Sequence, residues 1–218
     1  MKIEFEKQFP WALLPCKPNK PHWDKDDAEI CNEEFRWLIS NRVPERCAPW
    51  RIAQQLGYII RSPITCTIAP FIEYELAPSV LNDQPGLDEF IKNSGVTQLW
   101  ERDGSCLGIK EGEWLKLYSY RQQDKWVNIF IPNGQGSVEW HLGFNVIVPN
   151  EYFIFVMPYH LDGKDFEIPL GVIPGKTLTS INQSCSFSIT IKPLNKCTIR
   201  RNMPIARIIL LHKDSICE

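Results

Sequence analysis

The chain has 218 residues, of which 44% are hydrophobic and 23% are charged, and its formal net charge is −2. This length and composition are typical of one globular domain that folds without metal or disulfide staples. The nearly balanced charge disfavours a nucleic-acid-binding protein, which needs a clustered basic face, and the absence of a long apolar run disfavours a membrane protein.

The eight cysteines form no zinc-binding or redox pattern, because no Cys-x-x-Cys spacing is present. The first six residues also lack the apolar segment of an export signal. We therefore expect a cytoplasmic protein with reduced thiols, in which several cysteines serve as small buried hydrophobic side chains.

The first 57 residues are expected to form an extended arm and a small helical cap. Four prolines exclude a helix over residues 8–23, so this segment should lie extended over the domain, with its aromatic side chains buried. An apolar face predicts a helix over residues 28–40. A second, shorter helix is expected between Pro49 and Gly57, because proline fits the first helical turn and glycine follows the last.

Residues 58–218 are expected to form a β-rich body in the same single domain. Strands are predicted at residues 58–61, 65–69, 71–75, 97–101, 115–120, 126–131, 138–148, 152–157, 170–173, 185–191 and 205–211. Residues 77–96 are expected to be a loop with one helical turn at 87–91. The pattern predicts a mainly β fold, a β-sandwich, roll or barrel of β-clip or jelly-roll type, with an N-terminal helical cap.

The favoured binding residues surround the predicted helix after Pro49. Arg46 and Arg51 flank the helix start, where guanidinium groups and free backbone amides attract anions, and Arg61 follows on the next strand. Trp50 and Trp140 would cover the apolar part of the same ligand. We therefore expect a small anionic or aromatic ligand, or a protein partner, to bind here; the alternative is that the arginines pair with nearby glutamates.

His160, Asp162 and His212 form the most suggestive metal-binding pattern. Two histidines and one carboxylate make the facial triad of non-haem iron oxygenases. However, His160-Leu161-Asp162 precedes Gly163, as in a hairpin turn, and the few residues after His212 contain no arginine to hold a 2-oxoacid. An oxygenase that uses Fe(II) and 2-oxoglutarate is therefore kept as an alternative, and no cofactor is favoured.

Two short motifs occur far apart in the chain. The first is Arg46-Cys47-Ala48-Pro49 ahead of Gly57-Tyr58, and the second is Met203-Pro204-Ile205-Ala206. Together they resemble a family of uncharacterised proteins, a domain of unknown function found in bacteria and tailed phages. The resemblance implies the family's fold and a bacterial or phage-infected cytoplasm, but no reaction. A structural or virion-associated subunit is a further alternative, and a homo-oligomer is left open.

The C-terminal part carries a second set of motifs. Gly171-Val172-Ile173, the alternating strand that ends at Ile191, and the closing Ile205-Ala206 are similar to elements of dUTPases and dCTP deaminases. Pro174 stands where those enzymes place a catalytic aspartate, and Arg207 stands where they place a closing glutamine. The resemblance therefore implies a related β fold without nucleotide hydrolysis.

Overall fold

The computed structural model describes residues 3–19, 48–102, 104–159 and 164–215. The fold is mainly β and sandwich-like, as the sequence predicts, and the described strands form several antiparallel sheets without closing a barrel. The strands are β1 (Glu4–Lys7), β2 (Tyr58–Arg61), β3 (Cys66–Ile68), β4 (Ile72–Leu76), β5 (Gln98–Arg102), β6 (Ser105–Lys110), β7 (Ser119–Gln122), β8 (Lys125–Asn128), β9 (Phe130–Gly134), β10 (Ser137–His141), β11 (Phe144–Ile147), β12 (Tyr152–Pro158), β13 (Phe166–Glu167), β14 (Gly171–Pro174), β15 (Ser188–Pro193), β16 (Cys197–Ile199) and β17 (Pro204–His212). The helices are α3 (Ala48–Gln55), α4 (Pro78–Leu81), α5 (Gln84–Ser94) and α6 (Gly175–Ser184), with 3-10 turns η2 (Glu113–Lys116) and η3 (Lys213–Ser215).

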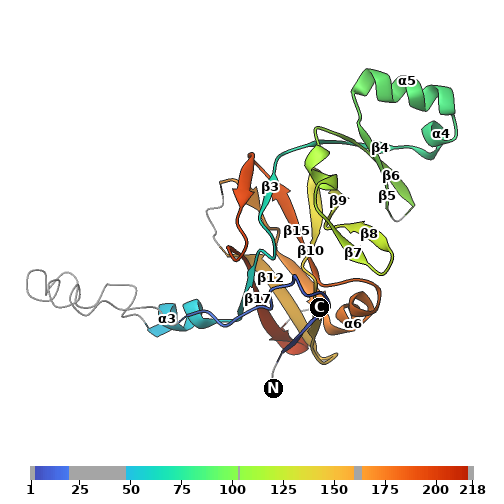
Figure 1. The fold of residues 1–218 in the computed structure, drawn as a ribbon. Coiled ribbons are helices and arrows are strands. Elements are labelled where there is room, and N and C mark those ends of the chain that lie inside the picture. The colour runs from blue at the N-terminus through green and yellow to red at the C-terminus, as the bar shows by residue number, and fades with distance from the viewer. Residues whose placement is uncertain (1–2, 20–47, 103, 160–163, 216–218) are drawn as a thin grey trace, which may run out of the picture.

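Two four-stranded sheets form the body of the molecule. Their strand orders are β14-β12-β17-β2 and β13-β15-β10-β9, and smaller pairs join β1 to β11, β3 to β16 and β7 to β8. A third sheet, β4-β6-β5, lies at one end of the body and carries α4 and α5, whereas α3 lies on the other side (Figure 1). The chain therefore presents a central β body with a helix-bearing extension at each side.

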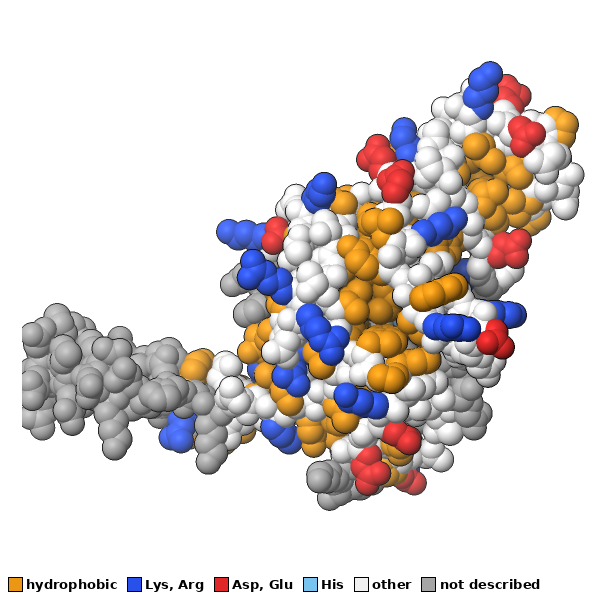
Figure 2. Space-filling model, in the orientation of Figure 1, with side chains coloured by type: hydrophobic (Ala, Val, Ile, Leu, Met, Phe, Trp, Pro, Cys, Tyr) orange, Lys and Arg blue, Asp and Glu red, His pale blue; other side chains and the backbone are white. Residues whose placement is uncertain are grey.

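The hydrophobic core is formed largely by side chains of the central strands and is rich in aromatic rings. Trp140, Phe130, Phe144 and Phe187 are fully buried, and the Phe130 and Trp140 ring centroids are 5.1 Å apart. A smaller cluster, which includes Leu87, lies under α4 and α5. In the view of Figure 2, hydrophobic side chains gather over the middle of the body, and charged side chains surround them. No helix in the described ranges is long and apolar enough to cross a bilayer.

The proline-rich arm lies over the body through residue 19, as predicted. Trp11 stacks on Phe9 and covers Gly143, where a Cβ atom would lie 2.6 Å from the indole. Further along the arm, Cys16 and Ile59 exchange two backbone hydrogen bonds of 3.1 and 2.8 Å. The predicted helix over residues 28–40 lies outside the described residues.

Some elements differ from the prediction. Residues 77–96 form two helices rather than a loop, because Pro78 and Pro85 occupy first turns, where a missing N–H is tolerated, and Gly95 ends α5 in the left-handed region. The single strand expected over 138–148 is two strands, β10 and β11, separated at Gly143, whose φ is 76°. The strand expected over 115–120 begins in the 3-10 turn η2, and the single strand expected over 126–131 is divided between β8 and β9. Strands β1, β6, β13 and β16 and helix α6 were not predicted.

Candidate functional site

A pocket of about 410 Å³ lies where the arm, α3, β2 and β17 meet. We call it the arm pocket. The residues that define it are Lys17, Trp50, Gln54, Arg61, Tyr159 and Arg207. They come from four segments that are distant in the sequence, so the pocket exists only in the folded chain.

Local backbone structure places α3 beside this pocket. Pro49 lies in the first turn of α3, and Gly57 follows the helix with a φ of 71°, a left-handed value that favours glycine. The chain thereby turns directly into β2, which pairs with β17 in antiparallel register, Tyr58 opposite Ile208. Trp50 and Gln54 are one helical turn apart and half-buried, so this face of α3 forms a wall of the arm pocket.

Three cationic side chains line the arm pocket, and none of them forms an ion pair with a carboxylate in the described part of the chain. Arg61 donates Nη1 to the Asn202 side chain at 2.8 Å, while its buried Nε has no partner among these residues. Arg207 donates to the Ala53 carbonyl at 3.0 Å, and the Lys17 ammonium lies 3.9 Å from the centre of the Tyr58 ring. The positive charge of this pocket is therefore not neutralised by the described residues.

Aromatic rings complete the lining. Trp50 faces the pocket from α3, and the Arg207 guanidinium lies 5.8 Å from the centre of the Tyr159 ring. Such rings bind planar apolar groups and also stabilise a neighbouring cation. The arrangement can thus hold an anionic group beside a planar apolar one.

The predicted site residues are only partly brought together. Trp50 lines the arm pocket, but Arg51 is exposed and does not line it. Trp140 is fully buried in the core, so its side chain cannot cover a ligand beside Trp50. Arg46 lies outside the described residues. Lys17 and Arg207 also line the arm pocket but were not predicted to lie beside Trp50, because no local pattern links them to α3.

The predicted iron site is described only at His212. His160 and Asp162 lie outside the described residues, and the preceding Tyr159 donates its backbone N–H to the Ile205 carbonyl. His212 lies at the other end of β17, roughly 23 Å from Ile205 at about 3.3 Å per residue. There its Nδ1 is 3.1 Å from an Asp214 carboxylate oxygen. The described ranges contain no group of three His, Cys, Asp or Glu side chains that could hold a metal ion.

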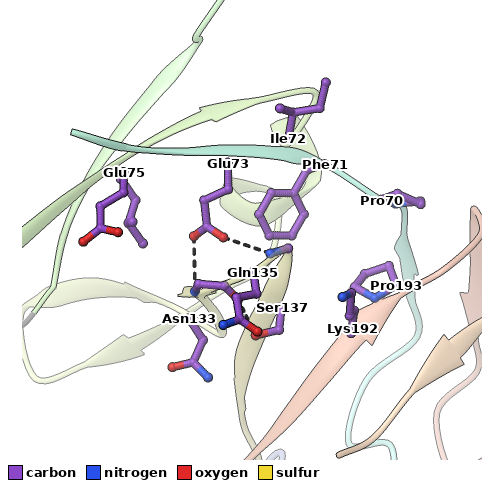
Figure 3. Close-up of a pocket in the computed structure, with 13 residues that line it drawn as sticks. Pro70, Phe71, Ile72, Glu73, Glu75, Asn133, Gln135, Ser137, Lys192 and Pro193 are labelled. Atoms are coloured by element: carbon purple, nitrogen blue, oxygen red, sulfur yellow. Dashed lines mark hydrogen bonds between the residues drawn. The ribbon is translucent and has the colours of Figure 1, made fainter.

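A larger groove of about 870 Å³ lies between β4, the β9–β10 turn and the end of β15 (Figure 3). We call it the β4 groove. The Glu73 carboxylate accepts hydrogen bonds from the backbone N–H groups of Gly134 and Gly136, at 3.2 and 2.9 Å. Gly134, Gln135 and Gly136 all have positive φ, a conformation whose amides converge on an anion. Glu73 therefore ties the turn to β4 and closes one side of the groove.

A third polar cluster joins β5 to β10 and β15. Glu139 on β10 accepts a hydrogen bond from Arg102 and another from the Ser188 hydroxyl, both at 2.6 Å. Burial alone would raise the pKa of Glu139, but Ser188, His141 and Arg102 together hold this pKa below its ordinary value. Because both carboxylate oxygens already accept hydrogen bonds, Glu139 links the third sheet, through β5, to the sheet that contains β10 and β15, and it offers no free base.

His141 belongs to the same cluster, but its ring makes poorer hydrogen bonds than the other members do. Its side chain is 5% exposed, and neither ring nitrogen makes a well-formed hydrogen bond within the described residues, although the ring approaches the Ser186 backbone. Burial lowers the pKa of His141, with a further contribution from Arg102, and the attraction of Glu139 does not compensate. Folding therefore favours the neutral form of this imidazole.

This neutral histidine predicts a loss of stability in mild acid. As the pH falls below about 6.5, the unfolded chain protonates at His141 more readily than the folded chain, so the free energy of unfolding decreases. The pKa of Glu139 is lowered in the folded protein, so this carboxylate also contributes stability that is lost in acid. That loss begins only as the pH falls below the ordinary glutamate pKa. We expect His141→Leu to flatten the slope of unfolding free energy between pH 7 and pH 5, measured by urea denaturation. An unchanged slope in His141→Leu would contradict the assignment.

Comparisons with known proteins add no family to this geometry. No protein-family model matches the chain, and no curated protein has significant sequence similarity to it. The resemblances drawn from short motifs therefore remain predictions.

Proposed function

We propose that the protein binds a small organic anion with a planar apolar group in the arm pocket. The observation that carries the proposal is the convergence of Lys17, Arg61 and Arg207 on one pocket, with no carboxylate among the described lining residues. Cations that lie close together without counter-charges repel one another, so a bound anion reduces the electrostatic repulsion that is present in the free protein. The volume of about 410 Å³ lies in the usual range of small-molecule sites.

The arrangement of the cations favours recognition of a compact anionic head. Arg61 and Arg207 both line the pocket with guanidinium groups, and a hydrogen bond between a guanidinium and an anion contributes about 1.5–3 kcal/mol. Trp50 and Tyr159 offer rings to the remainder of the ligand, since both line the same pocket. The proposed role is therefore binding, and the described lining supplies no arrangement that requires a chemical step.

Titration with phenyl phosphate tests this proposal, because the probe joins an aromatic ring to a compact anion. We expect saturable binding at one site by calorimetry, weakened by salt, with inorganic phosphate binding less tightly and phenol not at all. Cys16 also lines the arm pocket, so bound probe should slow its alkylation by iodoacetamide, as read by peptide mass spectrometry. Equal binding of phenol, or no binding of any of these anions at millimolar concentration, would refute the proposal.

A further inference from the structure

We propose that the outer face of the sheet β14-β12-β17-β2 is a dimer interface, which packs against the same face of a second copy of this chain. The outer face is the side of this sheet that is turned away from the hydrophobic core. Six of its residues carry the argument, namely Phe153, Phe155, Met157, Val172, Ile209 and Leu211. None of the six lines the arm pocket, so the inference does not depend on the proposed function.

The pairing of the strands places these side chains on one side of the sheet. Along β12, Phe155 lies between Ile154 and Val156, which are buried in the main core, so its side chain points the other way. Phe155 is opposite Ile209 on β17 and Val172 on β14, and opposite residues of paired strands share a side. The other three residues follow at every second position along β12 and β17.

The outer face is apolar although it belongs to no core of the described residues. An antiparallel sheet with one side in water normally carries polar side chains on that side. Here Val172 is 49% exposed and the other five side chains are half-buried, and none of the six packs in either hydrophobic cluster of the described chain. Helices α3 and α6 lie to either side of β12 and β17 (Figure 1). Leu170, which is 67% exposed just before β14, adds to this apolar surface.

Charge favours a second copy of the chain over a different partner. The four strands contain no Asp, Glu or Lys, and their two arginines, Arg61 and Arg207, both line the arm pocket. A different protein is usually selected and oriented by complementary charges, which the six apolar residues do not offer. The same face of a second copy brings no like charges against these residues, and interfaces between identical subunits are the more apolar kind.

The size of the outer face also suits a dimer. β12 has 7 residues, so it is about 23 Å long, and four strands spaced by about 4.8 Å are about 19 Å across. Two such faces would bury roughly 900 Å² even if they were flat, and protruding side chains increase this area toward and beyond the lower limit of about 1,000 Å² for a specific interface. Rows of Phe, Met, Ile and Leu can interdigitate as they do between the two sheets of a β-sandwich.

Light scattering during size-exclusion chromatography tests the proposal. We expect the native chain at micromolar concentration to show twice the mass of one chain, which is 25.3 kDa. Ile209→Lys should be a monomer, because it places two unpaired charges in an apolar interface. The matched control is Leu117→Lys, at an apolar residue that is 72% exposed outside this face, and it should remain a dimer. Circular dichroism verifies that each variant is folded.

Val172→Lys is the second variant, for use if Ile209→Lys does not fold. Val172 is already 49% exposed in the single chain, so a lysine there should leave the fold intact and still prevent dimer formation. Arg61→Ala, in the arm pocket, should remain a dimer, so a failure of this inference is distinguishable from a failure of the proposed function.

Three results would each overturn this inference. The first is a monomeric native chain; if that monomer also sediments with phosphatidylcholine vesicles and Ile209→Lys does not, the outer face belongs to a membrane surface instead. The second is a dimer that persists in the folded lysine variants of Ile209 and Val172. The third is an equal loss of the dimer in Leu117→Lys, which would place the interface elsewhere.

Discussion

Arg61→Ala is expected to reduce phenyl phosphate binding by roughly 10- to 100-fold, which corresponds to about 1.5–3 kcal/mol for a lost charge-assisted hydrogen bond. Arg61 lies at the end of β2, where it bonds Asn202 and keeps a buried Nε without a partner among the described residues. Removing it takes away both a positive charge and a guanidinium group that lines the pocket. Calorimetry of the folded variant measures the effect directly.

Arg51→Ala is the matched control. Arg51 is an arginine of the neighbouring helix α3, but it is exposed and does not line the arm pocket, so its loss should change the affinity little. Arg61→Lys should give an intermediate affinity, because lysine keeps the charge and loses the planar fork. If Arg61→Ala fails to fold, Trp50→Ala tests the same pocket from α3. Equal losses in the Arg51 and Arg61 variants would place the anion elsewhere.

Gly57→Ala is expected to cost more than 3 kcal/mol of unfolding free energy, or to prevent folding. Gly57 has a φ of 71°, which a non-glycine residue adopts at a cost of about 1–3 kcal/mol. In addition, the new Cβ would overlap the carbonyl oxygen of Ile208 on β17. This contact is with backbone, so relief would require β2 and β17 to separate. Urea denaturation measures the loss.

Gly104→Ala separates the two contributions to this cost. Gly104 has a φ of 80°, close to that of Gly57, but nothing lies within 4 Å of the position a Cβ would take. It should therefore show the conformational cost alone, about 1–3 kcal/mol. If the two alanine variants lose the same stability, the close approach of Gly57 to β17 has no energetic role.

Local signals explain the parts of the fold that the sequence predicts correctly. Pro49 and Gly57 mark the ends of one short helix, and the apolar run of β2 follows at once, so α3 and the bounds Tyr58–Arg61 are confirmed. Prediction fails where a residue type is compatible with more than one local structure. Pro78 and Pro85 are typical of loops, yet here they begin helices.

The site was less predictable than the fold for a physical reason. Trp50 was found because it lies on a well-marked helix. Lys17 and Arg207 reach the arm pocket through tertiary contacts, the bridge between Cys16 and Ile59 and the pairing of β2 with β17. Nothing in the local pattern of β10 reveals that Trp140 faces the core rather than a ligand, since a tryptophan in an alternating strand suits either face.

The pairing of β2 with β17 also governs when the molecule can fold. β1, β2 and β3 lie early in the chain, but their partners β11, β17 and β16 are synthesised much later. Contacts between such distant segments slow folding, because a long loop must close before they form. Strand β2 therefore cannot form its pairing until β17 has been synthesised, and the arm pocket, which needs both Arg61 and Arg207, is assembled only after that point.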